Sequence, residues 1–325
     1  MATITHYSGR LANRSALSVV SVDDLRQCRT HPGNFDPERL SKIVPYCFDM
    51  SSGCLIAATD IDPLAAAAAP FHYQYLRQHA GEFVALNWQQ LQILSREPIC
   101  AESTVIFSPG RCGSTLLANI LAANKIVTVS EPDFITQMVP LLKQALTNNQ
   151  PTLARMLHLV RLALRLLLKP ILNEPSLYAL KMRSHANRAP LLLLQAFDKP
   201  PKPIFINRDF ASWSRSRARA FNSTLQASLN SYWLAQQAQK KLSSCGPLLD
   251  LDYAQLTASP AKVSEQIAAY LGQPLQLSAT VGATAIDSQR GTPLAREHIA
   301  SKPHNLPDEA TLTQLWQYYA RRRPV

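Results

Sequence analysis

One short segment combines the residue types that bind a phosphate group. Residues 107–117 read FSPGRCGSTLL. Gly110 and Gly113 allow the backbone to turn tightly and to approach an anion closely. Ser114 and Thr115 offer hydroxyls in the first turn of the helix expected from residue 114, whose N-terminal N–H groups attract negative charge. The segment therefore predicts a phosphate-binding loop, although a tight turn between a strand and a helix without a ligand is the alternative.

The basic residue of this loop distinguishes it from the loops that bind nucleoside triphosphates. Those loops follow the pattern GxxxxGK[ST], with lysine on the β- and γ-phosphates and the hydroxyl on magnesium. In this chain Gly113 precedes Ser114, and the cation of the loop is Arg111. A kinase-like phosphotransferase is thus an alternative with little support, and we expect no metal ion.

The loop resembles the 5′-phosphosulfate loop of sulfotransferases, which use 3′-phosphoadenosine 5′-phosphosulfate. Its form there is P-[RK]-x-G-[ST]-T-[LW]. Arg111 matches the basic residue and Gly113 the glycine, while Gly110 is an additional residue after Pro109. By this resemblance, the residues of the loop that contact the cofactor are Gly110, Arg111, Cys112, Gly113, Ser114 and Thr115.

A second segment matches the part of sulfotransferases that binds the 3′-phosphate. Family members read R-[DN]-P-x-x-x-x-x-S after a strand, and residues 205–221 read FINRDFASWSRSRARAF. Arg208 and Ser216 match the ends of this pattern. Arginine can pair with phosphate oxygens, and Ser216 lies about two helical turns further along. An ordinary basic amphipathic helix is the alternative explanation.

Two later segments extend the resemblance over about 190 residues. Residues 248–275 are similar to a strand, a Y-x-x-L turn and a long helix, which we expect to be structural. Residues 288–298, SQRGTPLAREH, resemble a segment that closes over the 3′-phosphate. Arg290 and Gly291 are therefore predicted to contact the cofactor.

Sulfuryl transfer requires in-line positioning and neutralisation of charge on the leaving phosphate. Arg111 would supply that charge, and the acceptor needs a base. Glu131 follows the second predicted strand, 20 residues after Arg111, which is close to the spacing of the catalytic glutamate in tyrosylprotein-type sulfotransferases. A helix cap is its alternative role. His185 is a second candidate base, and Lys181 is a candidate sulfate contact.

The predicted function is sulfuryl transfer to a hydroxyl or amine of a small or carrier-borne acceptor, whose identity the sequence leaves open, as it does the oligomeric state. A non-catalytic nucleotide-binding protein is the alternative from another functional class.

These residues require a scaffold in which several strands end at the same edge. Short apolar runs at 104–107, 126–129, 177–182, 203–207 and 248–253 alternate with longer helical patterns. The expected helices cover 114–124, 134–147, 152–168, 187–197, 209–220, 224–243 and 260–272. Nearly continuous apolar strands between helices indicate an α/β fold, a P-loop-like parallel sheet flanked by helices. We expect this domain over 99–325, preceded by a mixed α/β extension of unknown role over 1–98.

Composition limits the classes of partner. The 325 residues carry a formal charge of +11, which suits a polyanionic ligand. No zinc-finger spacing, aromatic RNP segment or basic region with heptads is found, so we expect no nucleic-acid partner. The most apolar segment, 157–172, contains three basic residues on one helical face and predicts no membrane span. The start lacks an apolar signal region and the six cysteines form no CxxC pair, so we expect a cytoplasmic protein with reduced thiols.

Overall fold

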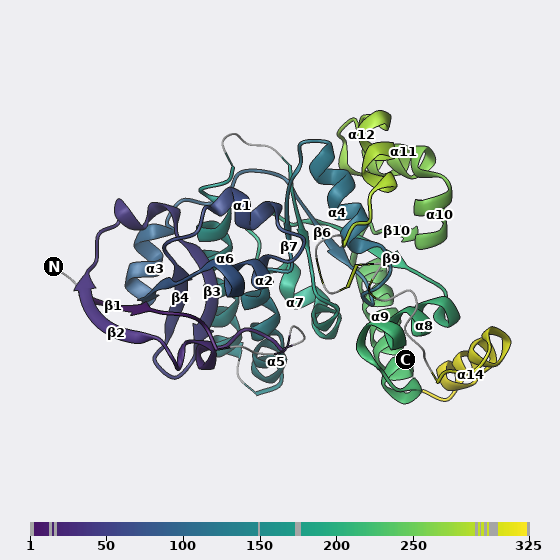
Figure 1. Cartoon of the computed structure of the whole chain (residues 1–325), viewed down its shortest axis with the longest axis horizontal. Helices are drawn as coiled ribbons and strands as arrows, with labels where there is room; N and C mark the ends of the chain where they lie inside the picture. The colour runs from purple at the N-terminus through teal and green to yellow at the C-terminus, as the bar shows by residue number, and fades with distance from the viewer. Residues whose placement is uncertain are drawn as a thin grey trace. The chain divides into compact units, whose positions relative to one another are not determined.

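A computed structural model describes residues 3–12, 15, 18–148, 150–172, 177–289, 292, 294–295, 298 and 305–323 of the chain (Figure 1). The chain divides into two compact units, and each is assembled from several segments. The first contains residues 1–103, 127–180 and 191–201, and the second contains residues 104–126, 181–190 and 202–325. The boundary at residue 98 predicted for an N-terminal extension stays a prediction.

The first unit is built on an antiparallel sheet with strand order β2-β1-β5-β4-β3. Its strands are β1 (Thr3–Ser8), β2 (Arg29–Asn34), β3 (Val44–Asp49), β4 (Cys54–Ala58) and β5 (Glu82–Leu86). β4 is an interior strand between β5 and β3 and nearly all of its residues are buried, whereas the edge strand β2 is largely exposed. Exposure of the edge explains why the sequence of β2, RTHPGN, is polar and contains proline.

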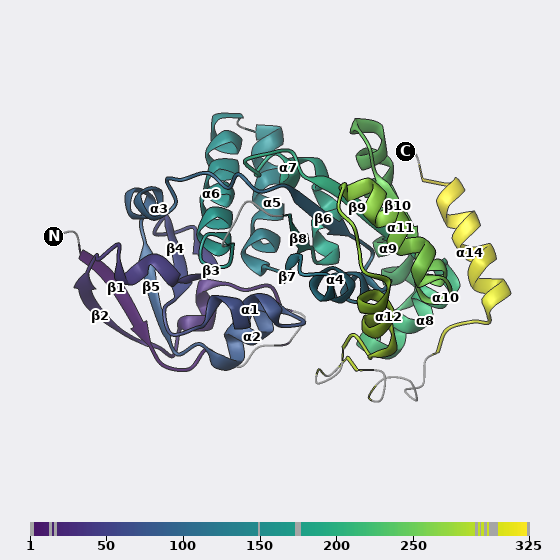
Figure 2. The ribbon, with the colours of Figure 1, turned by 90° about the horizontal axis from the view of Figure 1, so that it is seen from above.

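The first unit also contains α-helices. They are α1 (Pro63–Ala68), α2 (His72–His79), α3 (Trp88–Leu94), α5 (Asp133–Asn148) and α6 (Gln150–Leu168). The long helices α5 and α6 lie side by side and pack against β3 (Figure 2). The basic face of α6 contacts protein: the Arg165 guanidinium pairs with the Asp198 carboxylate at 2.6 Å, and Arg161 donates to the Gln195 carbonyl at 2.7 Å. Within the described ranges, no helix has the length and apolar character needed to span a bilayer.

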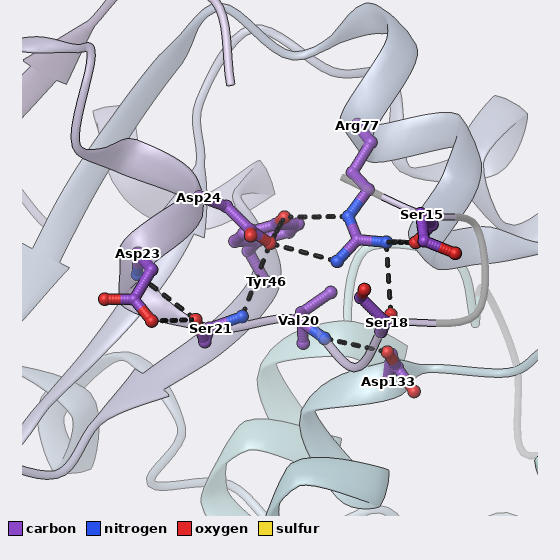
Figure 3. Close-up of polar contacts among 9 residues, drawn as sticks. All are labelled: Ser15, Ser18, Val20, Ser21, Asp23, Asp24, Tyr46, Arg77 and Asp133. Carbon is purple, nitrogen blue, oxygen red and sulfur yellow. Dashed lines mark hydrogen bonds and ion pairs between the residues drawn. The ribbon is translucent and has the colours of Figure 1, made fainter. Parts of the chain in front are cut away.

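A buried polar cluster ties four elements of the first unit together (Figure 3). Asp24 lies in the short helix η1 (Val22–Leu25), and its fully buried carboxylate accepts hydrogen bonds from the Tyr46 hydroxyl at 2.5 Å and from Arg77 at 3.1 Å. Arg77, on α2, also donates to the Ser18 carbonyl at 3.2 Å. Asp133, the first residue of α5, accepts the backbone N–H of Val20 at 3.0 Å. Since a buried charge needs a partner, this cluster fixes the N-terminal segment to the sheet and helices.

A second sheet has the predicted parallel architecture and the strand order β10-β9-β6-β8-β7. Its strands are β6 (Ser103–Phe107), β7 (Val127–Ser130), β8 (Tyr178–Lys181), β9 (Lys202–Asn207) and β10 (Leu249–Asp252). All five lie within one or two residues of the predicted runs. The fold is therefore α/β with a parallel sheet flanked by helices, as the sequence predicts.

Most predicted helices are also found. They correspond to α5, α6, α4 (Ser114–Ala123), α8 (Phe210–Phe221), α9 (Leu225–Cys245) and α11 (Pro260–Leu271). The single helix predicted over 187–197 is wrong: the chain forms η3 (Ser184–Arg188) and then α7 (Pro190–Leu194). Ala189 has φ −146° between them, because the residue before a proline disfavours the helical conformation. The sequence reading did not include α10 (Tyr253–Ala258), α12 (Leu277–Ala285) and α14 (Glu309–Arg321).

Candidate functional site

Three parallel strands of the second unit end side by side. Phe107 of β6 lies opposite Phe205 of β9, and Asn207 of β9 lies opposite Asp252 of β10. Each strand then leads directly into a segment with functional groups: β6 into the loop before α4, β9 into Arg208 and α8, and β10 into Tyr253 and α10. The carboxyl end of a parallel sheet is where α/β proteins assemble their ligand sites.

The loop after β6 has the backbone of an anion-binding turn. Gly113 caps α4 with φ 83°, a left-handed conformation that glycine adopts without strain. A Cβ at this position would also lie 2.7 Å from the Tyr253 ring, so two independent constraints require glycine there. Arg111 has φ 57°, which is unusual for a residue with a side chain. The loop therefore directs the N-terminal N–H groups of α4 toward one point.

A pocket of about 290 Å³ opens at this point. Its walls come from the loop, α4, α8, α10, the end of α12 and the segment after it, all within the second unit. Six predicted cofactor contacts line it: Arg111, Gly113, Ser114, Thr115, Arg208 and Ser216. The loop and the separate Arg208 segment, about 100 residues apart in sequence, thus contribute to one pocket.

The two arginines are in direct contact within the pocket wall. Arg111 donates from Nε to the Ser216 hydroxyl at 3.3 Å and from Nη1 to the side-chain carbonyl of Gln289. Arg208 donates to the Arg111 backbone carbonyl at 3.4 Å, and its guanidinium lies 4.5 Å from the centre of the Tyr253 ring. Burial and the neighbouring charge of Arg208 lower the pKa of Arg111. Placing two positive charges together costs free energy that a bound anion would recover.

Carboxylates do little to neutralise the guanidinium groups of Arg111 and Arg208. Asp287 lines the pocket and its charge raises the pKa of Arg111, although by less than burial and Arg208 lower it. In the described parts of the chain, neither Arg111 nor Arg208 forms an ion pair with a carboxylate. The pocket is therefore electropositive.

Buried aromatic residues anchor the backbone on both sides of the pocket. Trp213, a fully buried residue of α8, donates from its indole N–H to the Gly110 carbonyl at 2.6 Å. Tyr232, on α9, donates from its hydroxyl to the Arg208 carbonyl at 2.6 Å. The two rings are 5.0 Å apart, and Trp316 from α14 lies 4.8 Å from the Tyr232 ring. Together these rings fix the segments that carry Arg111 and Arg208.

The other predicted site residues that the structure describes are not among the residues that line the pocket. Gly110 and Cys112 belong to the loop without lining the pocket; the Cys112 thiol is buried and donates to the Gly110 carbonyl at 3.3 Å. Lys181 is buried at the end of β8, and His185 is exposed on η3. Glu131 follows β7 in the first unit. Arg290 and Gly291 lie outside the described residues.

Sequence reasoning missed several pocket residues. The polar residues among them include Tyr253, Arg219, Ser212 and Gln289. Tyr253 was expected to be structural, yet its ring contacts Arg208 and forms part of the wall. For Arg219 a signal was present, since it lies three residues after Ser216 and therefore on the same face of a helix.

No family model and no curated protein sequence matches the chain. Similar solved structures include the sulfotransferase domain of the Synechococcus PCC 7002 olefin synthase, with 17% identity, a TM-score of 0.43, and coverage of 69% of this chain and 96% of that one. Sulfotransferase STF9 from Mycobacterium avium has 10% identity, a TM-score of 0.45, and coverage of 82% and 84%. Retinol dehydratase in complex with androsterone and the inactive cofactor PAP has 11% identity, a TM-score of 0.40, and coverage of 69% and 80%.

Proposed function

We propose that this protein is a sulfotransferase that moves a sulfuryl group from 3′-phosphoadenosine 5′-phosphosulfate to a hydroxyl or amine of a small or carrier-borne acceptor. The observation that carries the proposal is the meeting of Arg111 and Arg208 in one electropositive pocket at the N-terminus of α4. Two guanidinium groups held together in this way are suited to a ligand with more than one anionic group.

The residues of the pocket fit such a nucleotide. Ser114 and Thr115 lie at the start of α4, where hydroxyls and backbone N–H groups would hold the 5′-phosphosulfate. Arg208 and Ser216 would hold the 3′-phosphate, in agreement with the resemblance of their segment to sulfotransferases. The nucleotide supplies an activated sulfuryl group with a phosphate as its leaving group.

Backbone strain supports functional roles for two residues. Four non-glycine residues of the described chain have positive φ: Arg111, Lys125, Glu131 and Asn222. Lys125 and Asn222 lie at the ends of α4 and α8, where a left-handed residue commonly terminates a helix. Arg111 and Glu131 terminate no helix, and a left-handed residue costs about 1–2 kcal/mol. Such strain concentrates at functional sites.

We assign Glu131 as the general base. Its carboxylate would accept the proton of the acceptor as the acceptor oxygen or nitrogen forms a bond to sulfur. The bond between sulfur and the 5′-phosphate oxygen would break with its electron pair on that oxygen, where Arg111 would stabilise the negative charge. Lys181 and His185 are the further candidates for contact with the sulfate and for the base.

Calorimetry with adenosine 3′,5′-bisphosphate and with ATP plus Mg²⁺ tests the proposal against kinase-like chemistry. We expect the bisphosphate to bind at least about 10-fold more tightly, because each charge-assisted hydrogen bond contributes about 1.5–3 kcal/mol. Arg208→Ala should weaken binding of the bisphosphate and leave binding of adenosine 5′-monophosphate nearly unchanged.

A catalytic assay separates an enzyme from a binding protein. Labelled sulfate in the nucleotide, offered with a panel of small hydroxyl and amine compounds, should appear in a product. Tighter binding of ATP with Mg²⁺ would contradict the proposal in favour of a phosphotransferase, and tight bisphosphate binding with no transfer to any class of acceptor would favour a non-catalytic nucleotide-binding protein.

A further inference from the structure

A third arginine of the pocket lies outside the positions that match the sulfotransferase sequence patterns. Arg219 lies on α8 and lines the same pocket as Arg111 and Arg208. We propose that Arg219 binds the 3′-phosphate together with Arg208 and makes the pocket selective for nucleotides phosphorylated at both the 3′ and 5′ positions. This inference rests on the proposed function and adds the residue that sets its cofactor specificity.

The placement of Arg219 follows from helix geometry. Ser212, Ser216 and Arg219 are spaced i, i+4 and i+7 along α8, so they share one face, and all three line the pocket. With a rise of about 1.5 Å per residue, the Cα of Arg219 lies roughly 4.5 Å beyond that of Ser216 along the helix axis. Long helical side chains lean toward the N-terminus and cover the preceding turn. The Arg219 guanidinium is therefore directed back over the turn that carries Ser216.

The neighbouring arginines of α8 have other contacts. Arg215 pairs with Glu309 of α14 at 3.3 Å, and the Arg217 guanidinium lies 5.5 Å from the centre of the Trp213 ring. Arg219 lines the pocket instead, and over the residues that the structure describes it forms no ion pair with a carboxylate. Of the basic run at 215–219, Arg219 is thus the member suited to an anionic ligand.

The charge of the pocket supports the same assignment. Among the described residues, three arginines and one aspartate, Asp287, line it, and serine and threonine hydroxyls provide much of the remaining polar wall. A nucleotide with a single phosphate would leave part of this positive charge without a counterion. A doubly phosphorylated nucleoside offers oxygens to both Arg111 and the pair formed by Arg208 and Arg219.

The test compares Arg219→Gln with Arg215→Gln, a matched change on the same helix that leaves the pocket lining intact. Calorimetry measures the affinity for adenosine 3′,5′-bisphosphate and for adenosine 5′-monophosphate, and thermal unfolding checks that each variant is folded. We expect Arg219→Gln to weaken bisphosphate binding about 10-fold to 100-fold and to change monophosphate binding by less than about 3-fold. Arg219→Lys, which keeps the charge, should recover part of the loss. Arg215→Gln should bind both nucleotides as the wild type does.

The outcomes separate this inference from the proposed function. A wild-type protein that binds the bisphosphate no better than the monophosphate would overturn both. A wild type that prefers the bisphosphate, with an Arg219→Gln variant of unchanged preference, would overturn the role of Arg219 alone. Equal losses for the two nucleotides in Arg219→Gln would likewise overturn selectivity through the 3′-phosphate.

Discussion

Replacement of Trp213 by phenylalanine tests whether the aromatic cluster sets the shape of the phosphate loop. The indole N–H donates to the Gly110 carbonyl at 2.6 Å, and the Trp213 side chain is fully buried. Trp213→Phe keeps an aromatic ring next to Tyr232 and removes the donor. The Gly110 carbonyl would then keep the weaker donor provided by the Cys112 thiol.

Two contributions determine the expected loss of stability. Removing the main donor of this partly buried acceptor costs about 1–3 kcal/mol. The smaller ring leaves a cavity, for which we expect roughly a further 1 kcal/mol. Chemical denaturation should therefore show a free energy of unfolding reduced by about 2–4 kcal/mol. Since the same carbonyl belongs to the loop, calorimetry should show affinity for adenosine 3′,5′-bisphosphate reduced about 10-fold.

Trp316→Phe is the matched control. Trp316 belongs to the same cluster and stacks on Phe210 at 5.4 Å, but within the described part of the chain its indole forms no hydrogen bond. It is also partly exposed, so its loss should reduce the free energy of unfolding by about 1 kcal/mol and leave nucleotide affinity unchanged. Equal effects of the two variants on affinity, or full affinity in Trp213→Phe, would refute the idea that the indole N–H fixes the loop.

Two other predictions concern catalysis and stability. Glu131→Gln should reduce turnover roughly 10²–10⁴-fold in the labelled-sulfate assay without weakening nucleotide binding, whereas His185→Gln should retain turnover; the reverse pattern would make His185 the base. Burial lowers the pKa of His72 to about 4, below its usual value of 6.5. The unfolded chain therefore takes up a proton first as the pH falls from 6.5 to 4, and the free energy of unfolding should decline by about 1.4 kcal/mol per pH unit, to a total of roughly 3 kcal/mol. His72→Phe should remove this dependence in pH-dependent denaturation, and His79→Phe on the exposed part of the same helix should retain it; an unchanged slope in His72→Phe would contradict the assignment.

The second sheet is predicted well because each of its strands can be recognised from its own short segment of the sequence. A strand buried on both faces consists of a short apolar run, and the runs at β6 and β9 differ from their flanking helices in length and composition. The strands β1 and β2 of the first sheet lack this local signal. β1 pairs with β5, more than 70 residues later, and its edge partner β2 is polar. Antiparallel pairing over such distances depends on tertiary packing, which no single segment specifies.

The residues of the site also differ in whether a short segment of sequence is enough to predict their position. Arg111 and Ser114 were predicted because a glycine-containing turn followed by a helix directs backbone N–H groups toward one point. Arg208 was predicted because its segment resembles the one that binds the 3′-phosphate in sulfotransferases, and both kinds of information are local. Arg219 and Trp213 depend on the rotation of α8 about its axis. Trp213 is on the face that packs on the aromatic cluster, whereas Arg219 is on the face that lines the pocket. Both faces are present in the periodicity of residues 210–221, but their assignment requires knowing which side of the helix is buried.

The orientation of α8 about its own axis gives this helix two linked roles at the proposed cofactor site. One face holds the loop through the Trp213 indole, and the other presents Ser216 and Arg219 to the ligand. Because a helix turns as a rigid unit, any rotation that moved Arg219 away from the pocket would also withdraw the donor from the Gly110 carbonyl. The loop and the 3′-phosphate contacts should therefore form together, so the Trp213→Phe and Arg219→Gln effects on bisphosphate affinity should be non-additive in the double variant. Strict additivity of the two free energies would show that the faces of α8 act independently.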